Sequence, residues 1–185
     1  MSPRGPGQPI ILTRDTPATT VPHGQSVELS AGGLVFLVQR LGRSFTVRSE
    51  MGTLLRVDGT DADALGLEPP ADPPSGSGAE GGAFSMDQVM AALHTVFDPE
   101  IPVSIVDLGL VYRCEEQDRQ GLRHIDIDMT MTAPGCGMGS ILQSDATRAV
   151  EAVSGVDSVT VNLVFDPPWS INAMSEEVRL ELGLL

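Results

Sequence analysis

A stretch without large apolar side chains divides this sequence near its middle. Residues 68–82 read Glu-Pro-Pro-Ala-Asp-Pro-Pro-Ser-Gly-Ser-Gly-Ala-Glu-Gly-Gly. Such a segment has nothing to bury in a core, and its Pro, Gly and Ser content is typical of a mobile tether. We therefore expect a small N-terminal domain at residues 10–67, a flexible linker at residues 68–82 and a larger C-terminal domain at residues 83–185.

The N-terminal domain shows short apolar or alternating runs that are separated by turn residues. The runs lie at residues 27–29, 34–41, 45–48 and 54–57, and Pro22-His23-Gly24 and Asp58-Gly59 are turn signals between them. Several short strands in so short a segment predict a small β-rich domain, either a barrel-like fold or a sandwich.

The C-terminal domain mixes the helical period with the period of strands. A capping box at Ser85 and Gln88 opens a helix that we expect to end at Asp98-Pro99. Alternation predicts strands at residues 110–114 and 125–131, joined through residues 117–121, and a further strand at 159–165. Helical spacing predicts a helix over residues 142–153 and a short last helix from Ser175 to Gly183.

These elements predict an α+β fold in the order α-β-β-α-β-α. The β-α-β unit between residues 125 and 165 makes its two strands parallel. We therefore expect a three-stranded mixed sheet with helices packed on one face.

Charge argues against nucleic acid as a partner. The chain has 25 acidic residues against 11 basic ones, which are all Arg, and its formal net charge is -14. Binding to phosphates needs clustered cations, which this sequence does not offer. Most of the negative charge follows the linker, where we expect an acidic solvated surface.

Neither a membrane span nor a disulfide framework is expected. The longest uninterrupted apolar run, residues 33–38, is far shorter than a membrane helix, and residues 1–10 lack the apolar core of a signal peptide. A cytoplasmic location is therefore expected. The two cysteines, Cys114 and Cys136, cannot by themselves build a closed metal site with four ligands.

Cys136 is the candidate for a reactive or ligating atom. It lies between the strand predicted at residues 125–131 and the following helix, in the turn Thr132-Ala133-Pro134-Gly135-Cys136-Gly137-Met138-Gly139. A thiol at the start of a helix is favoured as thiolate, and glycine neighbours leave it accessible. The alternative is a small residue that only fits its turn. Cys114 is in phase with Leu110 and Tyr112 on a strand, so we expect a buried, inert thiol there.

Carboxylates and a threonine accompany this turn. Two prolines stiffen the stretch that carries Asp98, Glu100 and Asp107, whose side chains suit either oxygen ligation and base chemistry or the capping of turns. Two roles are open for Thr132 as well. Its hydroxyl could donate a hydrogen bond to a thiolate or a bound ligand, or it could cap its own turn.

A cysteine-dependent enzyme is disfavoured, because such a nucleophile normally needs a base. The three histidines, His23, His94 and His124, have no sequence signature that pairs one of them with Cys136. Trp169 suits a shield of the site, a partner surface or an aromatic plug at one end of the sheet.

Four motifs in the C-terminal domain resemble the metal-sulfur cluster assembly domain family, which also includes cytosolic iron-sulfur targeting factors and PaaD-like proteins. They are Asp98-Pro99-Glu100-Ile101-Pro102, residues 105–111 (Ile-Val-Asp-Leu-Gly-Leu-Val), Thr132-Ala133-Pro134-Gly135-Cys136 and Asp166-Pro167-Pro168-Trp169. In the N-terminal domain, Arg14-Asp15-Thr16, residues 38–42 and residues 61–66 resemble the extra domain of SufT proteins. The whole chain is thus similar to the SufT family.

The resemblance implies a role in the maturation of iron-sulfur proteins, with Cys136 as the principal functional residue. Asp107 and Thr132 match motif positions and are expected near a bound cluster. The leading hypothesis is a non-enzymatic assembly or transfer factor of the SUF pathway, in which Cys136 is one metal ligand of a transient, shared iron-sulfur cluster. Its expected partners are the assembly machinery and apo client proteins, and a homodimer would bring two copies of Cys136 together. The alternative is a protein-interaction adaptor that recruits clients, with Cys136 structural.

Overall fold

The computed structural model describes residues 7–70, 84–133 and 137–184. These form two compact units, Met1–Asp72 and Pro73–Leu185. The linker predicted at residues 68–82 lies mostly outside the described residues, as does Cys136 with its neighbours Pro134 and Gly135.

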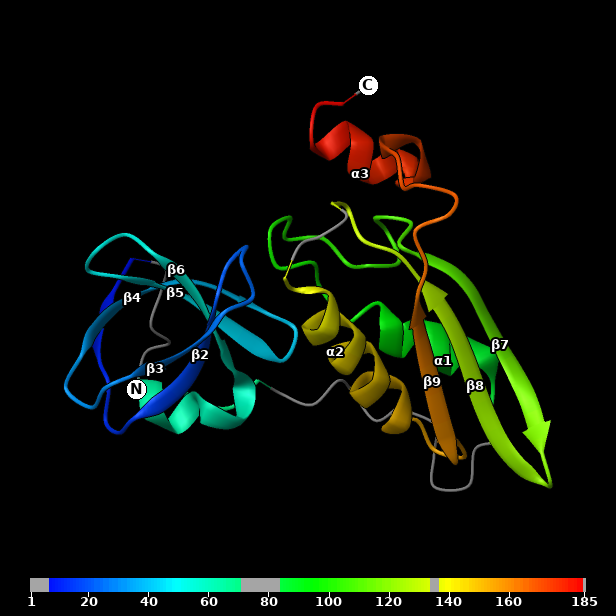
Figure 1. Ribbon diagram of the computed structural model, residues 1–185, viewed down its shortest axis with the longest axis horizontal. Coiled ribbons are helices and arrows are strands. Elements are labelled where there is room, and N and C mark those ends of the chain that lie inside the picture. Colours follow the sequence, from blue (N-terminus) through cyan, green and yellow to red (C-terminus); the bar gives the residue numbers. More distant parts are fainter. Residues whose placement is uncertain (1–6, 71–83, 134–136, 185) are drawn as a thin grey trace. The chain divides into compact units, whose positions relative to one another are not determined.

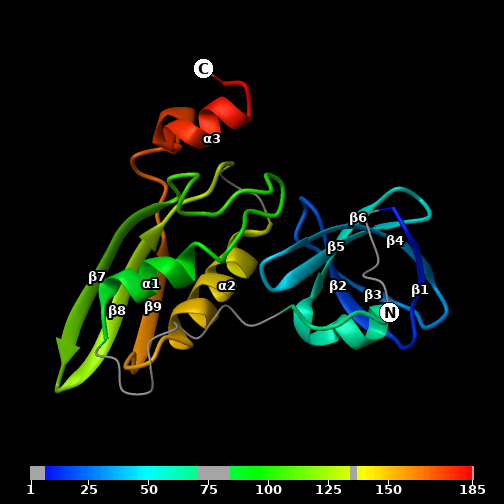
Figure 2. The ribbon, with the colours of Figure 1, turned by 180° about the vertical axis from the view of Figure 1, so that it is seen from behind.

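The first unit is a six-stranded antiparallel sheet (Figures 1 and 2). Its strands are β1 (Pro9–Ile11), β2 (Thr16–Thr20), β3 (Ser26–Leu29), β4 (Leu34–Leu41), β5 (Ser44–Ser49) and β6 (Leu54–Asp58), in the spatial order β1-β4-β5-β6-β2-β3. Alternate residues of these strands fill one core, with Phe45 and Val47 of β5 fully buried. The prediction of a β-rich unit is therefore confirmed. Strands β1 and β3 are the edge strands of its sheet.

A 3₁₀-helix, η1 (Gly59–Leu65), covers part of this core. The guanidinium of Arg14 donates from Nε to Asp63 Oδ2 at 2.8 Å and from Nη2 to Asp61 Oδ1 at 2.8 Å. Two stretches that the sequence marks as motifs, residues 14–16 and 61–66, thus bind each other, and this ion pair fixes η1 against the strand that follows Arg14.

The second unit has the predicted order of elements. It contains α1 (Met86–Leu93), β7 (Val111–Arg119), β8 (Leu122–Met129), α2 (Gly139–Glu151), β9 (Ser158–Leu163), the short 3₁₀-helix η2 (Ile171–Ala173) and α3 (Glu176–Glu181). The sheet order is β7-β8-β9, with β7 antiparallel and β9 parallel to β8. The predicted α+β class and three-stranded mixed sheet are confirmed.

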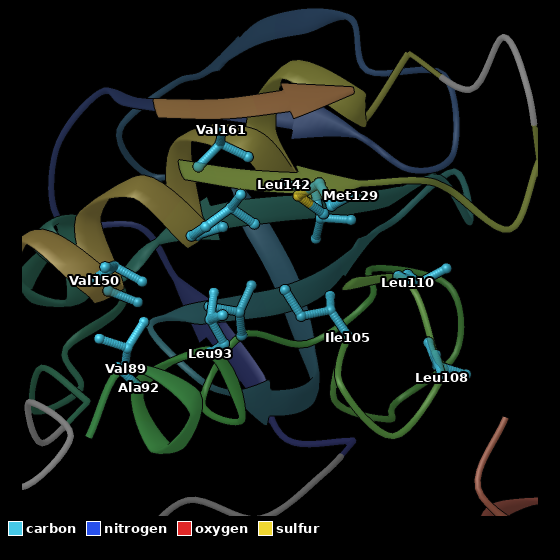
Figure 3. Packing of buried hydrophobic residues seen from close by; sticks show 14 of the residues in the cluster. Val89, Ala92, Leu93, Ile105, Leu108, Leu110, Met129, Leu142, Val150 and Val161 are labelled. Atoms are coloured by element: carbon cyan, nitrogen blue, oxygen red, sulfur yellow. The ribbon is translucent and has the colours of Figure 1, made fainter. Parts of the chain in front are cut away.

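Helices α1 and α2 pack on one face of this sheet. Ile125, Ile127 and Met129 of β8 are fully buried and belong to one cluster with Leu93 of α1 and Leu142 of α2. Figure 3 shows the labelled side chains of both helices and of the strands pointing into the same core. The alternate residues of β8 carry charge, as the strand period requires for a face that no helix covers.

Helix α3 departs from the expected layer. Figures 1 and 2 show it beyond the end of the sheet. Ser175 N donates to the Asp107 carbonyl at 2.9 Å, and Val178 is buried in the main cluster of the unit. The last helix is therefore attached to the loop that precedes β7 and not to the face that α1 and α2 share.

The first helix is shorter than predicted. Its N-terminus is as expected, because Ser85 N donates to Gln88 Oε1 at 3.2 Å in a capping box. It ends at Leu93, however, because Phe97 forms a β-bridge with Ser104 and Asp98 N donates to the Val103 carbonyl at 3.0 Å. The residues before Pro99 are therefore extended, as a following proline favours.

Among the residues that the structure describes, none of the helices has the length and apolar character that a membrane span requires.

Candidate functional site

The carboxyl ends of the parallel strands β8 and β9 form the edge at which the candidate site lies. Met129 of β8 lies opposite Leu163 of β9, and Val164 N extends the pairing with a bond of 2.8 Å to the Met129 carbonyl. In sheets of this kind, ligands are bound beyond the carboxyl ends of the strands. The Cys136 turn connects this end of β8 to the start of α2.

The glycine at the start of α2 lies close to side chains at the ends of both strands. A Cβ atom at Gly139 would lie 2.8 Å from Met131 Sδ and 3.2 Å from Leu163 Cδ1. The helix therefore starts in close contact with the ends of both strands. The helix begins at Gly139, three residues after Cys136 in the sequence. Cys136 itself lies outside the described residues, so its predicted role stays a prediction.

Thr132 lies at the same edge. It is half-buried and follows Thr130, whose N–H donates to the Leu110 carbonyl at 2.8 Å. That bond brings the segment of Thr132 next to the loop that contains Asp107. The predicted roles of Thr132, Asp107 and Cys136 in cluster binding stay predictions.

Asp107 is partly exposed and is held by its main chain. Its carbonyl accepts the bond from Ser175 N, while its carboxylate Oδ2 lies 3.6 Å from His94 Nδ1. Ser104 Oγ, which is buried, lies 3.4 Å from the same nitrogen. The structure thus joins Asp107 to His94, a pair that no sequence pattern predicts, because the two residues belong to different elements.

Asp98 has the structural role that the sequence left open. Its Oδ1 accepts bonds from Glu100 N and Ile101 N, both at 2.9 Å. Burial raises the pKa of this carboxyl above its usual range, although the two accepted bonds oppose the rise. Asp98 therefore caps its turn, and its bonded oxygen is not a free ligand.

Cys114 is a poor ligand in this structure. It is half-buried and packs against the main core. Burial raises the pKa of its thiol to about 11, and the neighbouring Glu115 adds to the rise. The thiol is therefore protonated at neutral pH, which agrees with the predicted inert role.

The segment after β9 closes this end of the sheet. Trp169 Nε1 donates to the Leu108 carbonyl at 2.8 Å, and its ring packs against the core. Tyr112 Oη donates to the Pro167 carbonyl at 3.0 Å. Of the three readings of Trp169, the aromatic plug agrees with these contacts.

Charged and sulfur-containing side chains do not gather into a complete metal site among the described residues, where no group of three His, Cys, Asp or Glu is placed to hold an ion.

Comparison with known proteins covers the second unit. Residues 86–163 match the family model described as "Iron-sulfur cluster assembly protein". The chain is 41% identical over 99 residues to the Fe-S protein maturation auxiliary factor of Porphyromonas gingivalis, a match that spans 54% of this chain and 91% of that protein.

Two further relatives have similar names. The Fe-S protein maturation auxiliary factor YitW of Bacillus subtilis is 38% identical over 98 residues, which are 53% of this chain and 93% of that protein. The Fe-S protein maturation auxiliary factor SufT of Staphylococcus aureus is 35% identical over 89 residues, 48% of this chain and 98% of that protein. These 89 residues already cover almost all of this SufT relative, so the match offers no counterpart for the first unit. The likeness of the first unit to an extra SufT domain therefore stays a prediction.

Relatives at 41% and 38% identity are covered over more than nine-tenths of their length, and the family model matches residues 86–163, so this chain belongs to the iron-sulfur cluster assembly protein family.

Proposed function

We propose that this protein is an iron-sulfur protein maturation factor that helps deliver clusters to apo-proteins. The observation that carries this proposal is the match of the second unit to nearly the full length of relatives that are named Fe-S protein maturation auxiliary factors. The cluster is the cargo of this function, and Cys136 is its transient ligand or the reactive thiol that handles it.

The thiol inventory supports a shared cluster. The chain contains two cysteines, and the thiol of Cys114 is half-buried with a raised pKa. One available thiolate cannot fill the ligand set of a closed cluster, for which four ligands are usual. The missing ligands would come from a second copy, from the assembly machinery or from the client, and a cluster held in this way is easily released.

The proposal describes a non-enzymatic factor. Transfer of a cluster exchanges one ligand for another at iron, so Cys136 acts as a ligand and needs no general base. The assembly machinery of the SUF pathway and apo client proteins are its proposed partners, and a cytoplasmic location remains a prediction from the sequence.

Anaerobic reconstitution with ferrous iron and sulfide tests the role of Cys136. We expect the wild-type protein to gain visible absorbance of a cluster and Cys136→Ala to lose it, while the control Cys114→Ala keeps it because its thiol is protonated. Absorbance that is equal in wild type and Cys136→Ala would contradict the ligand role.

The adaptor function is the second candidate, and it is favoured by the exposed large apolar side chains of Ile171, Leu180, Leu182 and Leu184. If the protein recruits clients without holding a cluster, wild type and Cys136→Ala will both stay colourless and will support maturation equally well in cells that lack their own copy.

A further inference from the structure

Exposed apolar side chains gather in the last part of the second unit. Ten large hydrophobic side chains of the described residues are exposed, and five of them lie within residues 165–184: Phe165, Ile171, Leu180, Leu182 and Leu184. Single exposed apolar residues are ordinary, whereas a concentration of them marks a contact surface. We use the name C-terminal surface for Ile171, Leu180, Leu182 and Leu184 with the carboxylates Glu176, Glu177 and Glu181.

Helix α3 presents Leu180 on the side that faces away from the core of the second unit. Val178 is the buried residue of α3 and marks its inner side, while Met174, which precedes the helix with extended backbone, is buried in the same cluster. Leu180 follows Val178 by two positions, so it projects from the opposite side of the helix, where its exposure reaches 69%. Packing within this unit therefore leaves Leu180 without an apolar neighbour to cover it from outside.

The negative charge of this segment favours a basic partner. Between residues 164 and 184 there are four carboxylates, at Asp166, Glu176, Glu177 and Glu181, against the single guanidinium of Arg179. Acidic groups around apolar side chains attract a segment that carries Lys or Arg and repel an acidic one. They also disfavour anionic membranes. A second copy of this surface is disfavoured as well, because a two-fold contact would set its own glutamates against each other.

The C-terminal surface is fixed to the loop of the candidate site. Ser175 N and Trp169 Nε1 donate to the carbonyls of Asp107 and Leu108, at 2.9 and 2.8 Å. A Cβ atom at Gly109 would lie 2.0 Å from the Ala173 carbonyl oxygen, so this loop and η2 are in direct contact. A polypeptide bound on α3 would therefore be held beside the loop that contains Asp107.

From these observations we propose that the C-terminal surface binds a partner polypeptide segment in which leucine-sized apolar side chains alternate with Lys or Arg. The identification of that partner as a client rests on the proposed function. The surface and its chemistry rest on the exposed side chains and the charges alone.

Fluorescence anisotropy with a labelled amphipathic peptide of Leu and Lys tests the proposal on the full chain. We expect this peptide to bind wild type, to bind less tightly as salt is raised, and to bind Leu180→Ser at least about tenfold more weakly, since a buried leucine side chain is lost from the contact. Leu122→Ser is the matched control. Leu122 is a leucine of the same unit with 56% exposure in the β7–β8 hairpin, and this variant should bind as wild type does.

Three results would overturn the proposal. They are equal binding by wild type and Leu180→Ser, equal binding of a peptide with Glu in place of Lys, and a loss of binding in Leu122→Ser as large as in Leu180→Ser. Sedimentation of wild type and Leu180→Ser identifies a second copy as the true occupant if only wild type forms dimers. A membrane is identified as the true occupant if wild type, but not Leu180→Ser, sediments together with phosphatidylserine vesicles. The peptide assay contains no iron or sulfide, so its failure is distinct from a failure of the proposed function.

Discussion

Cys114 illustrates how the surroundings of one side chain set its chemistry. Its strand position places the thiol half inside the core, next to the carboxylate of Glu115. Both surroundings disfavour the negative thiolate. Alternation with Leu110 and Tyr112 predicts a buried Cys114, but the thiol is only half-buried, because a bulge between Val111 and Arg113 shifts the register of β7 and its burial does not alternate.

Alkylation with iodoacetamide should therefore separate the two cysteines. At neutral pH we expect Cys114 to react about a hundredfold more slowly than a thiol with the ordinary pKa near 9, because each pKa unit changes the thiolate fraction tenfold. The rate should rise as the pH approaches 11. Peptide mass spectrometry over time measures both residues in one sample, and urea-unfolded protein is the control. Equal rates for Cys114 in folded and unfolded protein would show the burial argument to be wrong.

The pair formed by His94 and Asp107 is the opposite case at this scale. His94 caps the end of α1, and Asp107 lies in the loop that α3 anchors. No local pattern links these two positions. Only the path of the chain through the Phe97–Ser104 bridge brings the imidazole to the carboxylate, so their contact could not be predicted from the sequence.

Among the elements, the connection between the loop of residues 98–110 and the η2–α3 segment depends on one glycine. Gly109 has a φ of 67° and touches the Ala173 main chain. Both facts exclude a side chain there, one through backbone strain and the other through a clash with atoms that cannot rotate away.

Substitution of Gly109 by Ala should lower the free energy of unfolding of the second unit by about 3 kcal/mol. This figure adds the cost of alanine in a left-handed conformation to the cost of displacing the Ala173 main chain. Gly121→Ala is the matched control, because Gly121 has a φ of 83° and nothing within 4 Å of the added Cβ. We expect this control to cost about 1 kcal/mol. Urea unfolding gives both free energies, and similar losses in the two variants would mean that the contact with Ala173 contributes nothing.

The end of α1 shows what local patterns miss at the scale of elements. Apolar residues continue at helical spacing through Val96 and Phe97, so the sequence predicts a helix up to Asp98. The bridge of Phe97 with Ser104 is a contact across a loop, and it overrides this spacing. The β8-α2-β9 unit was predictable because its three elements are long, periodic and separated by clear turns.

The molecule as a whole consists of two units, and the matched relatives correspond to one of them. The 99 residues shared with the P. gingivalis protein are 91% of that protein, and the family match lies at residues 86–163. The second unit has its own core, built from α1, α2 and the sheet. It therefore has what an independent domain needs.

A chain that begins at residue 84 should fold by itself and support iron-sulfur protein maturation. We expect cooperative urea unfolding of this fragment, with a free energy within about 1 kcal/mol of that of the same unit in the full chain, because domains with separate cores are nearly independent. Activity is checked by complementation, with the fragment that carries Cys136→Ala as the control. A fragment that stays unfolded, or that folds without activity, would assign an essential role to the first unit.

The sequence alone determined the α+β class and the order of elements in the second unit. These features follow from composition and periodicity, which act over a few neighbouring residues. The tertiary structure decided that α3 lies beyond the end of the sheet, that Asp98 caps its turn, that Asp107 meets His94 and that Leu180 stays exposed. Each of these depends on contacts between distant parts of the chain, which form only when the whole unit packs around its core.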